Sequence, residues 1–223
     1  KQRTQYGVRS MRQKIVGVTN TKGGSGKSTV AIHVAHAAQE DGKDVCVVDA
    51  DSQGTVKDLA NARASDRQTP EVIYEDDPLS LHGTIERLQH ELVIVDSPGG
   101  LSEMTGEVLG VSDLTLVPVM PSVLDLWGMS EFEEVLKDQM ERGLKVALVT
   151  TKYNHASKLG EQMADHIEEE YPYYHHFAGG LCSRVVYKRQ MARGQTVLEA
   201  SDEKAKNEVR VLYNAMTDLL YDE

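Results

Sequence analysis

Lys22-Gly-Gly-Ser-Gly-Lys-Ser-Thr29 is the stretch of sequence that decides the fold of this chain. An ordinary phosphate-binding loop reads Gly, four residues, then Gly-Lys-Ser/Thr. Its backbone N–H groups surround phosphates, its lysine reaches them and its hydroxyl holds Mg²⁺. Gly26-Lys27-Ser28 completes that pattern, whereas Thr21 stands in place of the first glycine and Lys22 follows it. The sequence therefore predicts a phosphate-binding loop with one lysine more than usual.

The residues on either side of this loop fit a strand, a turn and a helix. Lys14-Ile-Val-Gly-Val-Thr19 is a short apolar stretch, and the residues from Ser28 onward keep helical spacing until about Gly42. A helix that begins at a glycine-rich turn directs its partial positive charge at an anion. A structural turn with incidental lysines is the alternative. The coincidence of strand, glycines, Lys-Ser pair and helix favours phosphate binding.

Further along the chain, apolar stretches alternate with helical segments. Strands are expected at 45–49, 71–74, 92–96, 114–119 and 144–150, and helices at 79–90, 123–142, 156–171 and 202–221. This alternation predicts an α/β fold: a single-domain, doubly wound, mostly parallel sheet with helices on both faces. Ligands of such sheets bind beyond the carboxyl ends of the strands, so the loops after Val18, Val48 and Val95 should share one site.

Two of these loops begin with carboxylates. Asp49 and Asp51 follow the second strand, and Asp96 ends the strand at 92–96. A carboxylate that faces a triphosphate from a strand end can hold Mg²⁺ through water or orient the attacking water. For Asp49, and less so for Asp51, capping of the next helix is an alternative role. Gly99 and Gly100 give the loop after Asp96 the freedom to respond to a phosphate group.

The two-lysine loop resembles the deviant Walker A motif of the ParA/MinD family of P-loop ATPases. The Asp-x-Asp-x-Gln segment at 49–53 and the strand ending at Asp96 are similar to further motifs of that family, although Ser52 stands where the family usually has proline. The segment 111–125 resembles small plasmid-partition members. The resemblance implies that Lys22 reaches across a nucleotide-sandwich homodimer to the partner's phosphates.

The resemblance also implies the ligands and their residues. ATP and Mg²⁺ are the expected cofactors. The expected catalytic residues are Lys22, Lys27 and Asp51, the last of which positions the attacking water. The expected phosphate-binding residues are Gly23, Gly24, Ser25, Gly26, Lys27, Ser28 and Thr29, and those expected at the metal are Ser28, Asp49 and Asp96.

The function that follows is an ATP-dependent dimeric switch that segregates or positions plasmid, chromosome or other cargo on nonspecific DNA. Its hydrolysis should be weak until a ParB-like or adaptor protein stimulates it. A MinD-like membrane-cycling ATPase is the alternative, but it needs a basic amphipathic C-terminal helix, and residues 218–223 are acidic. An iron-protein reductase would need cluster cysteines near the switch loops, and neither Cys46 nor Cys182 lies in the loop that directly follows Asp96. Asp51 argues against a scaffold that does not hydrolyse nucleotide.

Composition limits how this chain can meet nucleic acid. It has 223 residues, 40% of them apolar, and a net charge of −11, so its whole surface cannot attract phosphate backbones. A late basic segment is the exception, and its candidate DNA-binding residues are Arg184, Lys188, Arg189 and Arg193. The alternative is a solvated helix face. Two weak patches paired in a dimer would bind DNA more strongly than one.

The remaining expectations concern organisation and location. Residues 1–13 form a basic arm or a cloning remnant, and residues 14–223 form the ATPase domain. The chain has no apolar run of about 20 residues, so we expect a cytoplasmic, nucleoid-associated protein without stable membrane association. For His33 and His36, which are three residues apart, helix packing or surface placement is favoured over metal binding. Trp127 and Met129 are expected in a core or an interface.

Overall fold

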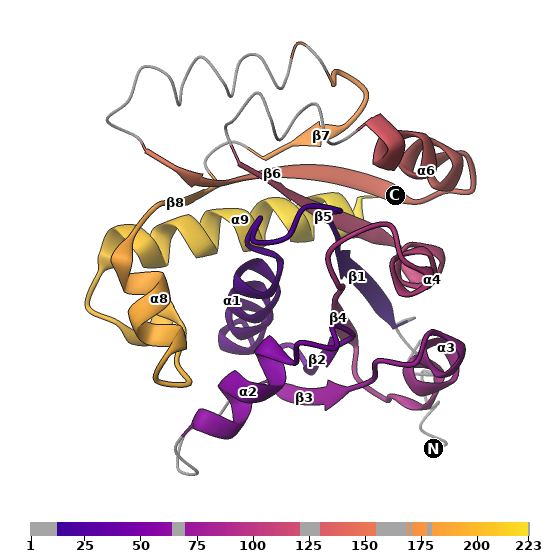
Figure 1. Ribbon diagram of the computed structural model, residues 1–223. Helices are drawn as coiled ribbons and strands as arrows, with labels where there is room; N and C mark the ends of the chain where they lie inside the picture. Colours follow the sequence, from indigo (N-terminus) through magenta and orange to yellow (C-terminus); the bar gives the residue numbers. More distant parts are fainter. Residues whose placement is uncertain are drawn as a thin grey trace, which may run out of the picture.

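A central sheet organises the computed structural model, which describes residues 13–63, 70–120, 130–154, 169, 171–177 and 180–222. The strand order is β3-β2-β4-β1-β5-β6-β7, with β8 paired to β6, and every pairing is parallel (Figure 1). The strands are β1 Lys14–Val18, β2 Val45–Asp49, β3 Glu71–Tyr74, β4 Leu92–Asp96, β5 Leu114–Val119, β6 Lys145–Tyr153, β7 His175–His176 and β8 Leu181–Cys182. Adjacent parallel strands end at the same edge, which gathers the loops after β1, β2 and β4.

Helices cover both faces of this sheet (Figure 1). They are α1 Lys27–Glu40, α2 Thr55–Ala62, α3 Pro78–Arg87, α4 Glu103–Val111, α6 Ser130–Glu141, α8 Val185–Met191 and α9 Glu203–Tyr221, with a short 3₁₀ helix, η1, at Val197–Glu199. The helices α1 and α9 pack against each other on one face, and α3 and α4 pack against each other on the other. The described part of the chain is therefore a doubly wound sheet.

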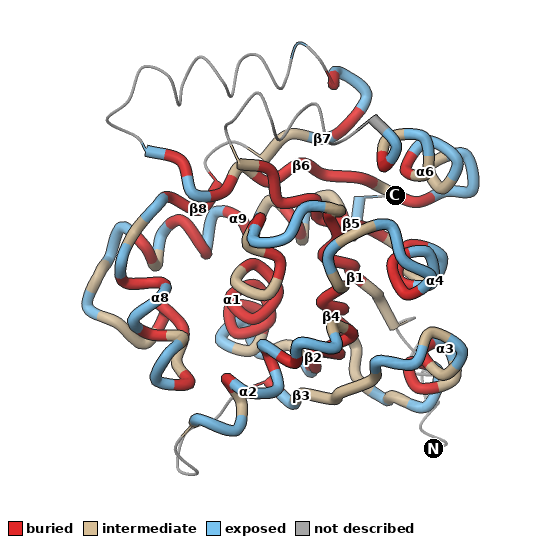
Figure 2. Tube along the Cα trace, viewed as in Figure 1, coloured by how far each residue is buried: buried red, intermediate tan, exposed pale blue. Residues whose placement is uncertain are grey.

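The central strands bury side chains on both sides, which explains their nearly continuous apolar sequence. In β2, Val45 and Val47 join the core under α1 and α9, whereas Cys46 and Val48 join the core under α3 and α4. Side chains of a strand alternate between faces, so each central strand contributes to two cores. Figure 2 shows this as buried chain through β1, β2 and β4.

The predicted fold class and the six predicted strands are confirmed, and β6 continues three residues beyond its predicted end. The final helix is also confirmed. The predicted helix 123–142 is observed as α6, and its residues 123–129, which include Trp127 and Met129, lie outside the described residues. Nearly all of the predicted helix 156–171 lies there too, as do residues 1–12. The structure adds α4 and the short strands β7 and β8.

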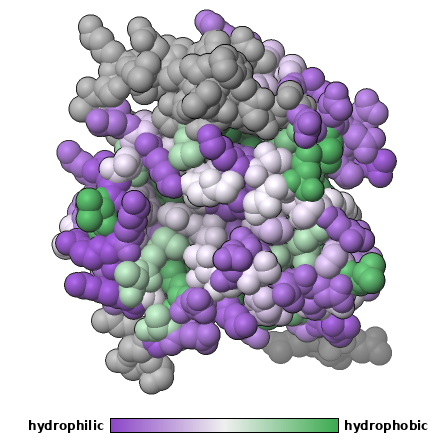
Figure 3. All heavy atoms as spheres, viewed as in Figure 1, coloured by the Kyte–Doolittle hydropathy of each residue, from purple (hydrophilic) through white to green (hydrophobic). Residues whose placement is uncertain are grey.

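The surface in the view of Figure 3 is mostly hydrophilic, with hydrophobic side chains in separate small patches. Leu79 and Val185 are the most exposed large hydrophobic side chains of the described residues, at 86% and 79%. Such isolated exposed side chains are common on folded proteins and identify no interface by themselves. Within the same part of the chain, no helix combines the length and the apolar character needed to cross a bilayer.

Candidate functional site

The glycine-rich loop between β1 and α1 forms the floor of the site. Gly24 and Gly26 have φ angles of 75° and 104°, in the left-handed region that favours glycine, and Gly26 is the N-cap of α1. The turn therefore depends on glycine at these two positions. The backbone N–H of Lys22 donates to Asn20 Oδ1 at 2.8 Å, while the Lys22 residue itself is exposed.

Lys27 projects into this loop from the first turn of α1. It is 7% exposed, and its Nζ donates to the carbonyl of Lys22 at 3.4 Å. Burial lowers the pKa of Lys27, although Asp96 and Asp51 act in the opposite direction. A buried ammonium that faces a concave loop of backbone N–H groups is suited to bind an anion.

Asp96 ends β4 directly behind this lysine and is fully buried. Among the described residues no donor makes a well-aligned hydrogen bond to either of its carboxylate oxygens, although the Ser28 hydroxyl lies close enough to affect its pKa. Burial raises the pKa of Asp96 to about 8, and the nearby Ser28 hydroxyl and Lys27 reduce that rise. An uncompensated buried carboxylate is costly, so the place of Asp96 beside the Ser28 hydroxyl is suited to bind a cation.

Asp49 lies beside Asp96 in the parallel register of β2 and β4, but its surroundings differ. Its Oδ2 accepts the N–H of Lys57 at 2.8 Å, and its Oδ1 accepts the N–H of Asp51 at 3.3 Å. Lys57 lies in the first turn of α2, so Asp49 stabilises the start of that helix. The structure thus favours the capping role for Asp49, and its role at a metal stays a prediction.

Asp51 extends from the loop after β2 toward the same space. It is half-exposed, and its carboxylate accepts the N–H of Gln53 at 3.0 Å. The loop after Asp96 closes the other side, where the N–H of Gly100 donates to the Thr21 carbonyl at 2.7 Å. A Cβ on Gly99 would stand 3.5 Å from Gly23 Cα and 3.6 Å from Lys27 Nζ. Because the two loops lie this close together, a movement of the loop after Asp96 would also shift the glycine-rich loop.

Most of the glycine-rich loop, Lys27 and Asp51 line one cavity of about 670 Å³, whereas Lys22, Asp49 and Asp96 are not among its lining residues. We call its two sides the phosphate wall and the far wall. The phosphate wall comprises Gly23, Gly24, Gly26, Lys27, Ser28, Thr29, Asp51, Ser52, Gln53, Thr55, Pro98 and Gly99, and the far wall comprises Thr151, Lys152, Leu181, Cys182, Ser183, Arg184, Tyr187, Lys188 and Met191. The volume falls in the usual range for small-molecule sites. One cavity therefore joins most of the predicted site residues.

The sequence profile of the CobQ/CobB/MinD/ParA nucleotide binding domain matches residues 16–197 of this chain. The chain belongs to this family. A relative from Halothiobacillus neapolitanus, "Maintenance of carboxysome distribution protein A", is 30% identical over 207 residues, which cover 88% of this chain and 93% of that protein. The ParA/MinD-type assignment thus spans the whole site.

Solved structures support the fold of this ParA/MinD-family chain. Cobyrinic acid a,c-diamide synthase from Mycobacterium smegmatis, with bound ADP and magnesium, has a TM-score of 0.74 at 17% identity, and the match covers 94% of this chain and 96% of that one. An ATP complex of a Cyanothece McdA variant has a TM-score of 0.72 at 16% identity, covering 92% and 96%. At these identities the likeness shows the fold alone.

Because the family binds nucleotides, we asked whether the residues around Ser28 and Asp96 fit a divalent cation. No group of three or more His, Cys, Asp or Glu side chains that could hold a metal occurs among the residues that the structure describes. Mg²⁺ keeps several waters and needs only one or two protein ligands beside phosphates. The Ser28 hydroxyl and the buried Asp96 carboxylate are oxygen donors of that kind. The residues present therefore fit a magnesium ion bound together with a phosphate ligand.

The far wall of this ParA/MinD-family site was not predicted from the sequence. Thr151 and Lys152 reach it from the carboxyl end of β6, and Cys182 and Ser183 reach it from β8. β8 has only two residues and gives no strand pattern of its own. Gly180 beside it was also missed; a Cβ there would stand 1.6 Å from the Thr150 carbonyl oxygen, so β8 reaches β6 only with glycine at this position.

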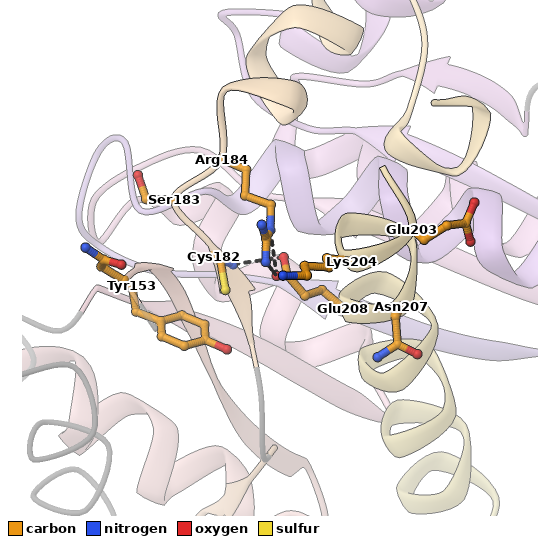
Figure 4. A pocket seen from close by; sticks show the side chains of 9 residues that line it. Tyr153, Cys182, Ser183, Arg184, Glu203, Lys204, Asn207 and Glu208 are labelled. Atoms are coloured by element: carbon orange, nitrogen blue, oxygen red, sulfur yellow. Dashed lines mark hydrogen bonds and ion pairs between the residues drawn. The ribbon is translucent and has the colours of Figure 1, made fainter. Parts of the chain in front are cut away.

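The basic segment divides into two parts in the structure. Arg184 is half-buried at the edge of the cavity and pairs with Glu208 of α9, with Nη2 and Oε1 2.6 Å apart (Figure 4). Glu208 also accepts from the Tyr187 hydroxyl at 2.9 Å and the Cys182 N–H at 3.1 Å. Arg184 is therefore part of an internal ion pair. By contrast, Lys188, Arg189 and Arg193 are exposed and remain candidates for DNA contact.

The two histidines of α1 pack inside the fold. His33 accepts the N–H of Val197 on Nε2 at 3.1 Å, while its Nδ1 contacts the Thr29 carbonyl at 2.7 Å. His36 Nδ1 lies 2.6 Å from the Thr196 hydroxyl. Both residues attach α1 to the segment between α8 and η1, as the helix-packing interpretation expects.

Proposed function

We propose that this chain is an ATP-dependent dimeric switch that positions cargo on nonspecific DNA. The observation that carries the proposal is a cavity lined by the phosphate loop, with Lys27 and Ser28, and by Asp51, next to which the buried Asp96 lies close to Lys27 and Ser28. Phosphoryl transfer requires chiefly positioning and charge stabilisation, and these groups supply both. The family assignment makes a nucleotide the ligand of that cavity.

In the proposed cycle, Ser28 and Asp96 would hold Mg²⁺, whose positive charge would offset that of the phosphates. Lys27 contacts the terminal phosphates, and Asp51 orients the attacking water from the loop after β2. Lys22 lies on the exposed side of the loop, where it can meet a second copy of the chain. Its ammonium would then stabilise charge on the partner's nucleotide, as an arginine finger does in trans.

The cargo and the partner belong to the same proposal. A ParB-like or adaptor protein would stimulate hydrolysis and connect the switch to its cargo. The relative that aligns over 93% of its length is named for carboxysome distribution, so cargo other than plasmids is included. Lys188, Arg189 and Arg193 would bind DNA weakly in one subunit and more strongly when the dimer doubles the patch.

The dimer is tested with two lysine variants that differ only in position along the loop. Lys27→Ala should abolish nucleotide binding. Lys22→Ala should retain ATP binding as a monomer but lose ATP-induced dimerisation, measured by light scattering after size exclusion, and most turnover. Unchanged dimerisation and hydrolysis in Lys22→Ala would overturn the proposed role of Lys22.

DNA binding is tested by mobility shift at low salt with ATP and Mg²⁺. The wild type should retain DNA, and retention should fall steeply as salt rises because bound counterions are released. Replacement of Lys188, Arg189 and Arg193 by glutamine should abolish it. No retention by the wild type at low salt would contradict this part of the proposal.

A MinD-like membrane cycle has less support from the structure. Such a cycle needs a basic amphipathic helix that is available to lipid. The apolar face of α9, with Val209, Leu212 and Met216, is buried in the core against α1. ATP-dependent sedimentation with anionic vesicles would nevertheless favour the membrane cycle over the DNA-based one.

A further inference from the structure

Two consecutive residues at the end of β6 hold two consecutive carbonyls of the phosphate-binding loop. The Thr151 hydroxyl donates to the Ser25 carbonyl at 2.6 Å, and the bond is buried. Lys152 Nζ donates to the Gly24 carbonyl. Lys152 also lines the cavity and is exposed to solvent there. The far wall thus contacts the backbone of the phosphate wall directly.

These contacts orient the N–H groups of the loop. In a planar trans peptide, the carbonyl of one residue and the N–H of the next point in opposite directions. Because the Gly24 and Ser25 carbonyls point toward β6, the N–H groups of Ser25 and Gly26 point away from it. A phosphate-binding loop depends on successive N–H groups that converge on one anion. Thr151 and Lys152 therefore fix two peptide planes of that arrangement.

The backbone at Lys152 is specialised for this contact. Its φ of 55° makes it the one non-glycine residue with positive φ in the described ranges. The pairing of β6 with β8 shifts register between Thr151 and Tyr153, so Lys152 is the extra residue of a bulge. Bulges redirect a side chain, and strained backbone is concentrated at functional sites. A bulge and a left-handed backbone conformation occur together at Lys152, which indicates that its side chain must point in this direction to reach the Gly24 carbonyl.

We propose that Lys152 is a positioning residue that holds the phosphate-binding loop in its binding conformation and thereby sets nucleotide affinity. The proposal rests on the nucleotide binding proposed above. Lys152 acts through the Gly24 carbonyl, which belongs to the loop and not to a particular phosphate. It should consequently affect ADP and ATP alike, in contrast to Lys22, which is assigned to the closed dimer.

The test compares Lys152→Met with the wild type by calorimetric titration of Mg-ADP and a nonhydrolysable Mg-ATP analogue. Methionine keeps the apolar stem and the strained φ but removes the ammonium. Loss of a charge-assisted hydrogen bond should raise both dissociation constants by roughly tenfold. KM for ATP should rise similarly while kcat stays within about twofold, and Lys152→Arg should restore most of the affinity. Lys137→Met, on the distant surface of α6, is the matched control.

A second variant separates folding from positioning. Lys152→Gly removes both the ammonium and the backbone strain, so it should unfold at a temperature no lower than the wild type and still bind nucleotide roughly tenfold more weakly. Wild-type affinity in both variants would overturn the proposal, as would a loss confined to the ATP analogue. Failure of the wild type to bind either nucleotide would instead contradict the proposed function itself.

Discussion

The charged groups at the two walls of the cavity differ in whether they are paired with another protein group. On the phosphate wall the pKa of Lys27 is lowered by burial, and next to this wall the buried carboxylate of Asp96 receives no well-aligned hydrogen bond from the described residues. On the far wall, Arg184 and Glu208 form an ion pair that Tyr187 and Cys182 complete. Buried charge without a partner marks a place where a ligand is needed, whereas fully paired charge marks structure. Substitutions in the two walls should therefore separate activity from stability.

Asp96→Asn should have the largest effect on activity and the opposite effect on stability. The amide keeps the shape but removes the charge that would hold Mg²⁺, so ATP turnover should fall by about 100-fold or more. Without nucleotide, the free energy of unfolding should increase by about 1–2 kcal/mol, because an amide avoids the cost of burying a carboxyl whose pKa is raised to about 8 on folding. Turnover assays and urea denaturation measure the two effects. Unaltered turnover would remove Asp96 from the metal site.

Arg184→Gln should have the reverse effects: it should lower the stability of the protein without reducing its DNA binding. It leaves Glu208, which is 8% exposed, without its cation, and this should lower the free energy of unfolding by about 3 kcal/mol. At temperatures where the variant is folded, DNA retention should match that of the wild type, since Arg184 is paired with Glu208. Lys188→Gln is the matched control, with a stability change below about 0.5 kcal/mol. Loss of DNA binding in folded Arg184→Gln would contradict the internal role of Arg184.

The same contrast explains what could be predicted from the sequence. The phosphate wall is encoded in contiguous motifs at strand ends, so Lys27, Asp51 and Asp96 could be recognised from local pattern. The far wall depends on pairings between distant segments. Arg184 looked like a surface cation because Glu208 follows 24 residues later, on another helix. Lys152 gives no sign of its role until the bulge between β6 and β8 is seen.

The missed helix α4 has a local cause. Gly106 and Gly110 lower helix propensity in the middle of Glu103–Val111, which obscures the pattern. Ser102 was the available signal, since its side chain accepts the N–H of Thr105 as an N-cap. The helix propensity of this segment is low, and the packing of Met104 and Val108 in the core stabilises the helix nevertheless.

The lowered pKa of His33 predicts that the folding stability of the protein depends on pH. Burial lowers the pKa of His33 to about 4, from about 6.5 in the unfolded chain. The unfolded state therefore binds more protons between these values, and the stability that neutral His33 provides is lost as pH falls below 6.5. From pH 7.5 to 5.5 this contribution should decrease by about 1.5 kcal/mol.

The measurement is urea denaturation of the wild type and His33→Gln at both pH values. Asp96 acts in the opposite direction, because its pKa is raised and its protonation on acidification favours the folded state. It is present in both proteins, so the difference between them isolates His33. Equal pH dependence in the two proteins would show that His33 is not the titrating group.

Asp49→Asn should have the smallest effect and tests the contrast between two aspartates at neighbouring strand ends. Asp49 and Asp96 end adjacent strands in register, yet Asp49 accepts two backbone N–H groups and Asp96 accepts none among the described residues. An amide has one acceptor oxygen, so one of the two bonds is lost, and the free energy of unfolding should fall by about 1 kcal/mol. Turnover should decrease less than tenfold. A loss of turnover as large as that of Asp96→Asn would place Asp49 at the metal and contradict its capping role, because capping acts on α2 and not on the phosphates.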